Sequence, residues 1–314
     1  MIFNPINYVT IEGPDLSGKT TLYNKLHKAS SYAWNIHDRS WLSMSIHAKQ
    51  YGRDTFACVE NFKKEIYNLN NIMIILLPRW QVIVDRFNKR GDDIQNIISL
   101  KKLYSEFKKA VEEFELFPNV IIVNTEINDG VIGNIIMQIN DYEKADTRSI
   151  QKNILNMCMT HKAYERVGLN FTIYDDGKFD DVNENDLLYE KEELYYKEIR
   201  YNIISKIQEE QMGMNEYNRC ETIESRRFIY TSDTCISLAH FLIRDNFLDC
   251  QFFLRSSNVK DTLYYDLNFL KSLAKEVYNH FELEKHMCRL NVMINSAHIP
   301  IIIDQQEVSN ESNV

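Results

Sequence analysis

The chain has 314 residues, 44% of them hydrophobic, which is enough apolar material for two globular domains with a core each. Its formal net charge of -9 argues against non-specific binding to nucleic acids over the whole surface, although a local basic pocket is compatible with it. No signal peptide is recognisable, and no apolar run approaches the roughly 18 residues that span a bilayer. The six cysteines form neither a CxxC pair nor a metal-binding spacing, so a disulfide framework and a zinc site are not expected and a reducing cytoplasm is.

The first half alternates strand and helix signals. Short apolar runs bounded by turn residues indicate buried strands, and the stretches between them have helical periodicity. This alternation predicts an α/β domain with a parallel sheet over residues 1–146. We expect strands at residues 6–12, 31–38, 71–77 and 119–124, and helices at 17–29, 40–51, 56–70, 79–91, 94–116 and 131–144.

The second half has a different pattern. Residues 175–197 are strongly acidic and are expected to form a solvated loop that leads into a helix. The pattern that follows predicts an α+β domain over residues 147–306, with a polar tail at 307–314. Its expected elements are strands at 226–231, 235–243, 248–255, 289–295 and 298–304 and a helix at 267–281.

Residues 13–20 (GPDLSGKT) match the phosphate-loop pattern GxxxxGK[ST], with a buried strand before it and a helix after it. In such a loop, glycines let backbone N–H groups wrap phosphate oxygens, and the helix N-terminus adds a positive dipole. Lys19 would reach the β- and γ-phosphates, and the Thr20 hydroxyl would ligate Mg²⁺. The pattern therefore predicts an ATP site formed by Gly13, Ser17, Gly18, Lys19, Thr20 and Thr21.

The stretch IEGPDLSGKTTL resembles the opening of thymidylate-kinase-like enzymes and their deoxynucleoside kinase relatives. Asp38 and Arg39 resemble the DR motif of this family, and Arg86 and Arg90 resemble its RxxxRG lid motif. The resemblance implies that Asp38 lies near the phosphoryl acceptor and Mg²⁺, that Arg39 contacts phosphate, and that both lid arginines neutralise the transferred group. The alternatives are a structural ion pair for the first two residues and a solvated helix face for the lid arginines.

One departure concerns the acceptor. The segment between Thr20 and Asp38 is short, so the acceptor-binding region of the family is abbreviated. The sequence therefore supports the ATP end of the site better than the acceptor end.

Residues 233–257 (DTCISLAHFLIRDNFLDCQFFLRSS) read as two apolar strands joined at residues 244–246. Together with the rest of 225–298 they resemble the thymidylate synthase and dCMP hydroxymethylase superfamily, in which a Cys is followed at a fixed distance by Arg-Ser, here Cys235 and Arg255-Ser256. The resemblance implies that the Cys235 thiolate adds to C6 of a pyrimidine nucleotide whose phosphate Arg255 and Ser256 bind. Arg226 and Arg227 resemble a pair that reaches the partner subunit's nucleotide, which implies a homodimer through this domain.

Two further positions concern the pyrimidine and the ribose. Asp266 stands where the enzymes that act on dCMP carry Asp, and His298 resembles the ribose-clamp His, although Pro300 replaces the family's Tyr. The other reading of Asp266 is a favourable charge at a helix N-terminus, and that of Cys235 is a small residue filling a β core.

Other departures affect the folate half of the site. Thr234 and Ile236 flank the cysteine in place of Pro and His, and Asn258 replaces an Asp that helps to bind folate. The family's N-terminal phosphate Arg, its Glu-containing helix and its C-terminal lid are not recognisable. An inactive or repurposed domain is therefore an open alternative.

The combined expectation is a bacteriophage-type enzyme of deoxynucleotide metabolism, in the host cytoplasm if viral. It would join an ATP- and Mg²⁺-dependent (deoxy)nucleoside monophosphate kinase to a pyrimidine C5 hydroxymethylase or methylase that uses methylenetetrahydrofolate, with dCMP favoured over dUMP. The main alternative is a kinase alone, with a degenerate second domain for nucleotide sensing or dimerisation. A non-enzymatic nucleotide-binding assembly protein is the third. Neither membrane nor nucleic acid is an expected partner.

Overall fold

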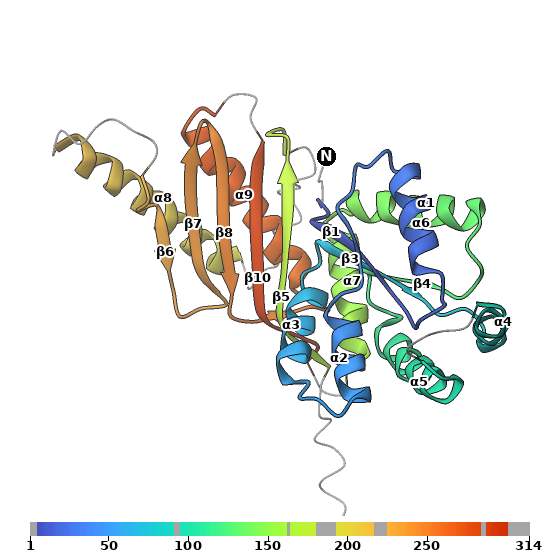
Figure 1. Ribbon diagram of the computed structural model, residues 1–314. Coiled ribbons are helices and arrows are strands. Elements are labelled where there is room, and N and C mark those ends of the chain that lie inside the picture. Colours follow the sequence, from blue (N-terminus) through green and yellow to red (C-terminus); the bar gives the residue numbers. More distant parts are fainter. Residues whose placement is uncertain are drawn as a thin grey trace, which may run out of the picture.

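The structure of the chain is a computed structural model that describes residues 5–90, 95–161, 164–179, 193–216, 225–283 and 287–300. Two β-sheets, each with its own helices, lie next to one another (Figure 1). Within these ranges, no helix is both long enough and apolar enough to cross a membrane.

The first sheet is four-stranded and parallel, which confirms the α/β expectation for the first half. Its order is β2-β1-β3-β4, formed by β2 (Ile36–Asp38), β1 (Tyr8–Glu12), β3 (Asn71–Leu76) and β4 (Val120–Val123). Every residue of β3 is buried, as its continuous apolar run requires. The expected strand at 31–38 is shorter because Ser31 and Tyr32, which follow the first helix, have positive φ.

Helices cover both faces of this sheet. The apolar sides of α1 (Lys19–Ala29) and α6 (Asp129–Glu143) pack on one face. On the other face lie α2 (Trp41–Gln50), α3 (Phe56–Ile66) and α5 (Ile97–Phe114). The remaining helix, α4 (Trp80–Arg90), follows β3 and packs against α5, and Gly91, the expected end of that helix, lies outside the described residues.

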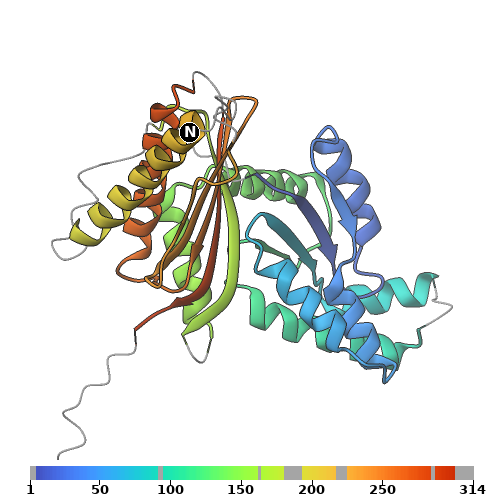
Figure 2. The same ribbon diagram turned by 90° about the vertical axis from the view of Figure 1, so that its left-hand side faces the viewer.

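The second sheet is mixed. Its main order is β5-β10-β8-β7-β6, with β10 parallel to β8 and the other neighbours antiparallel. Three helices, α7 (Thr147–Met159), α8 (Glu193–Glu216) and α9 (Leu263–His280), pack around one side, and Figure 2 shows α8 and α9 together on that side. The strands are β5 (Glu165–Asp175), β6 (Ile229–Thr231), β7 (Ile236–Arg244), β8 (Phe247–Leu254), β9 (Ser257–Asn258) and β10 (Cys288–His298).

Two features of this half differ from the expectation. Strand β5 was not predicted, although its residues Leu169, Phe171 and Ile173 alternate with more polar ones, as in a half-buried strand; Gly168 interrupts the pattern before them. The two expected strands at 289–295 and 298–304 are replaced by β10, which runs on to His298; Pro300 follows it, and residues 301–304 are outside the described part. Of the acidic stretch 175–197, residues 180–192 are also outside it, and α8 begins at Glu193.

The two sheets share one apolar core and direct hydrogen bonds. Asn70 donates from its amide to the carbonyl oxygens of Pro5 (2.8 Å) and Thr172 (3.2 Å), and its own amide oxygen accepts from the Thr172 N–H at 2.6 Å. The apolar cluster that contains Phe62 and Leu103 continues into Phe171 and Leu273 of the second half. Asp146, at the expected boundary, is the N-cap of α7, and the division into two domains there stays a prediction.

Candidate functional site

The carboxyl ends of neighbouring parallel strands bring three predicted motifs to one edge of the first sheet. The phosphate loop follows β1, the Asp38-Arg39 turn follows β2, and α4 with Arg86 follows β3. In open α/β sheets this edge is where ligands bind.

The backbone of the phosphate loop requires its two glycines. Gly13 has φ of 141°, and a Cβ built on it would lie 2.4 Å from the carbonyl oxygen of Leu76. Gly18, with φ of 107°, is the N-cap of α1. The first N–H groups of α1 therefore face the loop, as an anion-binding helix N-terminus requires. Of the other predicted ATP residues, Ser17 is buried, and Thr20 and Thr21 are exposed at the start of α1.

Lys19, at the end of the phosphate loop, bonds the residues at the start of the same loop. Its ammonium donates to the carbonyl oxygens of Gly13 (2.7 Å) and Pro14 (2.8 Å). Burial lowers the pKa of this ammonium, and the nearby carboxylate of Asp15 opposes the shift. A buried cation at the N-terminus of α1 suits the binding of phosphate.

The Asp38-Arg39 turn lies against the loop. Arg39 adopts a positive φ of 80°, which is strained for a residue with a side chain, and its guanidinium forms an ion pair with Asp15 at 2.9 Å. A second guanidinium nitrogen lies 3.4 Å from Nε2 of His47, whose pKa burial lowers. Asp38 is exposed at the end of β2, and its expected role as a metal ligand stays a prediction.

Two buried carboxyl groups hold the start of α2 in place, and the motifs did not indicate either of them. Glu12 accepts from both the N–H and the hydroxyl of Ser40 and of Ser43, and Glu65 accepts from the N–H of Trp41 at 3.3 Å. Burial raises the pKa of Glu12, and it raises that of Glu65 to about 7. The sequence does contain one signal for Glu12: it is a charged residue at the end of an otherwise apolar strand.

Of the two lid arginines, only Arg86 is bonded to the loop among the described residues. Its Nη1 donates to the carbonyl oxygens of Leu16 (2.9 Å) and Ser17 (3.0 Å), and Nη2 lies 3.5 Å from Glu126, beyond β4. Arg90 lies one turn further along α4 and is exposed. The structure thus brings Lys19, Arg39 and Arg86 to one loop.

The predicted hairpin forms the frame of a second candidate site. Asp245 and Asn246 both have positive φ, as the tight turn between β7 and β8 requires. The pairing sets Cys235 opposite Arg255, whose N–H donates to the Cys235 carbonyl oxygen at 2.8 Å. The hydroxyl of Ser256 lies 3.9 Å from Sγ of Cys235. Cys235 is exposed, so it does not fill the β core.

Arg255 and Asp266 both use their polar groups within the protein. Nη1 of Arg255 donates to the carbonyl oxygen of Asp233 at 2.8 Å. Asp266 is buried and accepts from the hydroxyls of Tyr196 (2.9 Å) and Ser257 (2.8 Å). A pyrimidine edge would therefore have to compete with Tyr196 for this carboxyl group.

His298 and Asn258 lie at the same end of the sheet, where β9 pairs with β10. Nδ1 of His298 is buried without a hydrogen-bond partner in the described structure. The amide oxygen of Asn258 accepts from the N–H groups of Lys260 and Asp261, which gives Asn258 a role in the local turn.

Arg226 and Arg227 are not brought to this site within one chain. Both are exposed, and the carbonyl oxygen of Arg226 lies 3.2 Å from Nε2 of His240. His240 is about 17 Å along β7 from Cys235, because a strand rises about 3.3 Å per residue. Any contact of these arginines with a Cys235 site would have to involve another copy of the chain.

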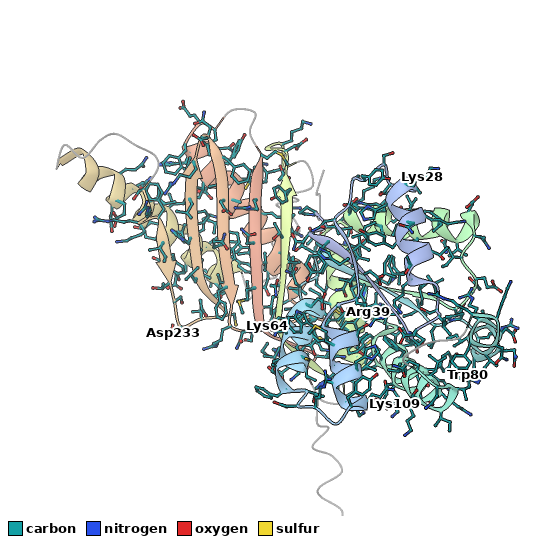
Figure 3. All side chains as sticks on the ribbon, viewed as in Figure 1. Lys28, Arg39, Lys64, Trp80, Lys109 and Asp233 are labelled. Atoms are coloured by element: carbon teal, nitrogen blue, oxygen red, sulfur yellow. The ribbon has the colours of Figure 1, made fainter. Side chains whose placement is uncertain are left out.

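The two candidate sites are separate. In Figure 3, Asp233, beside Cys235 in the sequence, lies below the second sheet, and Arg39 lies at the upper end of α2.

The part of the chain that the structure describes contains no group of three or more His, Cys, Asp or Glu side chains placed to hold a metal. Such a cluster is not needed for Mg²⁺, which binds mainly through nucleotide phosphates and one or two protein oxygens.

Comparisons with known proteins give little more. No protein-family model matches the sequence, and no curated protein matches it. Among solved structures, thymidylate synthase from T4 phage is similar over 26% of this chain and 32% of its own length, with 20% sequence identity and a TM-score of 0.22. The chain thus matches about a third of that enzyme, and at this TM-score the likeness establishes neither a shared fold nor a shared activity.

Proposed function

We propose that the first half of the chain transfers a phosphoryl group from ATP to a (deoxy)nucleoside monophosphate. The observation that carries this proposal is the meeting of Lys19, Arg39 and Arg86 at one phosphate loop, because phosphoryl transfer depends mainly on positioning and on neutralising charge.

Each residue has a role in this reaction. Lys19 holds the β- and γ-phosphates, and Thr20 and Asp38 supply oxygen ligands for Mg²⁺, which would neutralise phosphate charge when bound. Arg39 orients phosphate beside the acceptor. Arg86, with Arg90 one turn away, stabilises the charge that develops on the transferred group.

ATP consumption across a panel of nucleosides and monophosphates tests the proposal. We expect turnover with at least one monophosphate and its loss in Lys19→Ala. Lys28→Ala is the matched control, since Lys28 lies in the last turn of α1, away from the loop. If no acceptor gives Lys19-dependent turnover, the kinase proposal is wrong.

For the second half, we propose a site for a pyrimidine monophosphate in which the thiolate of Cys235 adds to C6 of the base, so that C5 can attack a one-carbon unit from methylenetetrahydrofolate. The nearness of Cys235, Arg255 and Ser256 supports this. The preference for dCMP over dUMP rests on the resemblance of Asp266 to the Asp of the enzymes that act on dCMP. Tritium release from [5-³H]dCMP or [5-³H]dUMP with methylenetetrahydrofolate tests it, with Cys235→Ser as the negative control. No release would favour the alternative of a kinase with a nucleotide-sensing or dimerisation domain.

We also propose a homodimer through the second half. On one side of the second sheet, alternate side chains of β7 and β8 stay partly exposed, and Met293 of β10 is 42% exposed. Arg226 and Arg227, which are far from Cys235 within one chain, could complete a phosphate site only across such an interface. Sedimentation analysis tests this: a dimer that Met293→Glu dissociates is expected, and a monomer at all concentrations would contradict it.

A further inference from the structure

Helix α2 carries one imidazole towards the phosphate loop. Ser40, Ser43 and His47 are spaced three and four residues apart, so they lie along one side of α2. The hydroxyls of Ser40 and Ser43 donate to Glu12, at the end of β1. Nε2 of His47 lies 3.4 Å from Nη1 of Arg39, in the turn before the helix. The side of α2 that Glu12 fixes therefore also carries His47 to Arg39.

The contact between His47 and Arg39 determines where the imidazole carries its proton. A guanidinium has N–H donors and no acceptor, so Arg39 must donate in this contact and Nε2 of His47 must accept. An accepting Nε2 carries no proton. The imidazole is therefore neutral, with its proton on Nδ1.

The surroundings of His47 favour this neutral form. Burial lowers the pKa of His47 below its ordinary value of 6.5. The carboxylate of Asp15 in the phosphate loop opposes the shift, and the cations of Arg39 in the turn and of Lys19 in α1 add to it. A proton on Nε2 would remove the acceptor and place a second positive charge beside the guanidinium. Protonated His47 therefore repels Arg39 instead of holding it.

The guanidinium of Arg39 needs more than one partner to keep a fixed orientation. Its ion pair with Asp15, at 2.9 Å, engages Nη2 alone, and the Arg39 side chain is 47% exposed. An ion pair with that exposure contributes little by itself, because solvent screens it and the long side chain keeps its freedom. The contact with His47 engages the other terminal nitrogen. With both nitrogens held, the plane of the guanidinium is fixed beside the phosphate loop.

We propose that His47 is a positioning residue for phosphoryl transfer: its neutral imidazole holds the guanidinium of Arg39 in the orientation that binds phosphate, and its protonated form releases the guanidinium. The inference rests on the proposed kinase function and adds to it a residue that belongs to none of the sequence motifs. Transfer should consequently weaken in acid, to an extent that depends on His47.

The dependence of kcat on pH, measured with the full chain, tests the assignment. Wild-type kcat should fall as the pH drops below 6.5, as the imidazole gains its second proton. His47→Gln offers an amide oxygen that accepts the same hydrogen bond without titrating, so it should keep most of the kcat and weaken this fall. His47→Ala should lower kcat about 10-fold with KM for ATP unchanged, since one hydrogen bond to a charged group is lost.

His280→Gln is the matched control, because His280 is exposed at the end of α9 in the second half of the chain. It should keep the wild-type profile. A His47→Gln profile that coincides with that of the wild type, or an equal change in His280→Gln, would overturn the assignment. Thermal melting shows which variants fold, and if His47→Ala does not, the comparison of His47→Gln with the wild type decides.

Nitrogen-15 NMR of the histidine side chains separates this inference from the kinase proposal, because it needs no turnover. The His47 signals, identified by their absence in His47→Gln, should show a proton on Nδ1 and none on Nε2 at neutral pH. Arg39→Gln should raise the pKa of His47, because it removes a nearby cation. If these results hold but no acceptor is phosphorylated, the kinase proposal is wrong and the contact that positions Arg39 stands. A proton on Nε2, or a pKa that Arg39→Gln leaves unchanged, would overturn the inference even in an active kinase.

Discussion

The carboxylate of Glu12 accepts two 2.6 Å hydrogen bonds from Ser40, one from its N–H and one from its hydroxyl. Glu12 ends β1, immediately before the phosphate loop, and Ser40 caps α2, immediately after the Asp38-Arg39 turn. One buried side chain thus fixes the distance between the two phosphate-binding motifs without touching a substrate.

We expect Glu12→Gln to lower both stability and turnover. The amide offers a single acceptor oxygen to four donors from Ser40 and Ser43 and introduces donors of its own, so the free energy of unfolding should fall by about 1–3 kcal/mol. Because the turn would then be poorly positioned, kcat should fall more than the affinity for ATP. Denaturant unfolding and ATP titration measure these effects. Glu60→Gln is the control, because it removes only an exposed ion pair with Lys63. If Glu60→Gln lowered the free energy of unfolding as much as Glu12→Gln does, the hydrogen bonds of Glu12 to Ser40 and Ser43 would not be the cause of the destabilisation.

Stability should depend on pH through Glu65. Its pKa in the folded protein is about 7, above the ordinary 4.5, because the group is buried and lies near Glu12. Between these two values the folded chain keeps a proton that the unfolded chain releases, so the contribution is fully present below pH 4.5 and is lost as pH rises towards 7, by at most about 1.4 kcal/mol per pH unit. Glu65→Gln should flatten the curve of unfolding free energy against pH in this window. The pKa of Glu12 is also raised, so a slope of the same sign should remain. A curve identical to that of the wild type would contradict the assignment.

Arg86→Ala should reduce kcat about 100-fold, because removing one hydrogen-bond donor that stabilises charge in the transition state usually has an effect of this size. The guanidinium also bonds the Leu16 and Ser17 carbonyl oxygens, so a smaller loss of ATP affinity should accompany it. Lys89→Ala, an exposed position on the same helix, should behave like the wild type. Equal effects of both variants would indicate a general effect of charge on α4.

Variants of Asp266 can distinguish a structural role of this residue from a role in recognising the pyrimidine base. Asp266→Ala leaves the hydroxyls of Tyr196 and Ser257 without their acceptor in a buried place, so the free energy of unfolding should fall by about 2–4 kcal/mol. Asp266→Asn keeps an acceptor oxygen and should cost less. If Asp266→Asn instead retains full stability and exchanges dCMP for dUMP as the preferred ligand, base recognition is the main role of this residue.

Sequence features predicted those parts of the fold whose backbone conformation is determined by residues adjacent in the chain. The apolar run of β3, the glycines of the phosphate loop and the Asp245-Asn246 turn each specify their own backbone. Strand β5 was missed although the alternation of Leu169, Phe171 and Ile173 with more polar residues is a local signal, whereas its pairing with β10, far along the sequence, has no local signal.

The residues of the candidate site also differ in whether local sequence could predict them. Lys19, Arg39 and Arg86 belong to short motifs, and the structure brings all three to one loop. Glu65 gains its raised pKa only when α3 packs beside α2. Such properties depend on contacts between distant segments, which no periodicity records.

The bonds that Asn70 makes across the two sheets have a consequence for how the molecule comes apart. Because both sheets also share one apolar cluster, neither half can lose its order without exposing hydrophobic side chains of the other. Heating should therefore give a single cooperative melting transition. A protease cut near residue 146 should yield fragments that aggregate when they are separated and regain order when they are mixed.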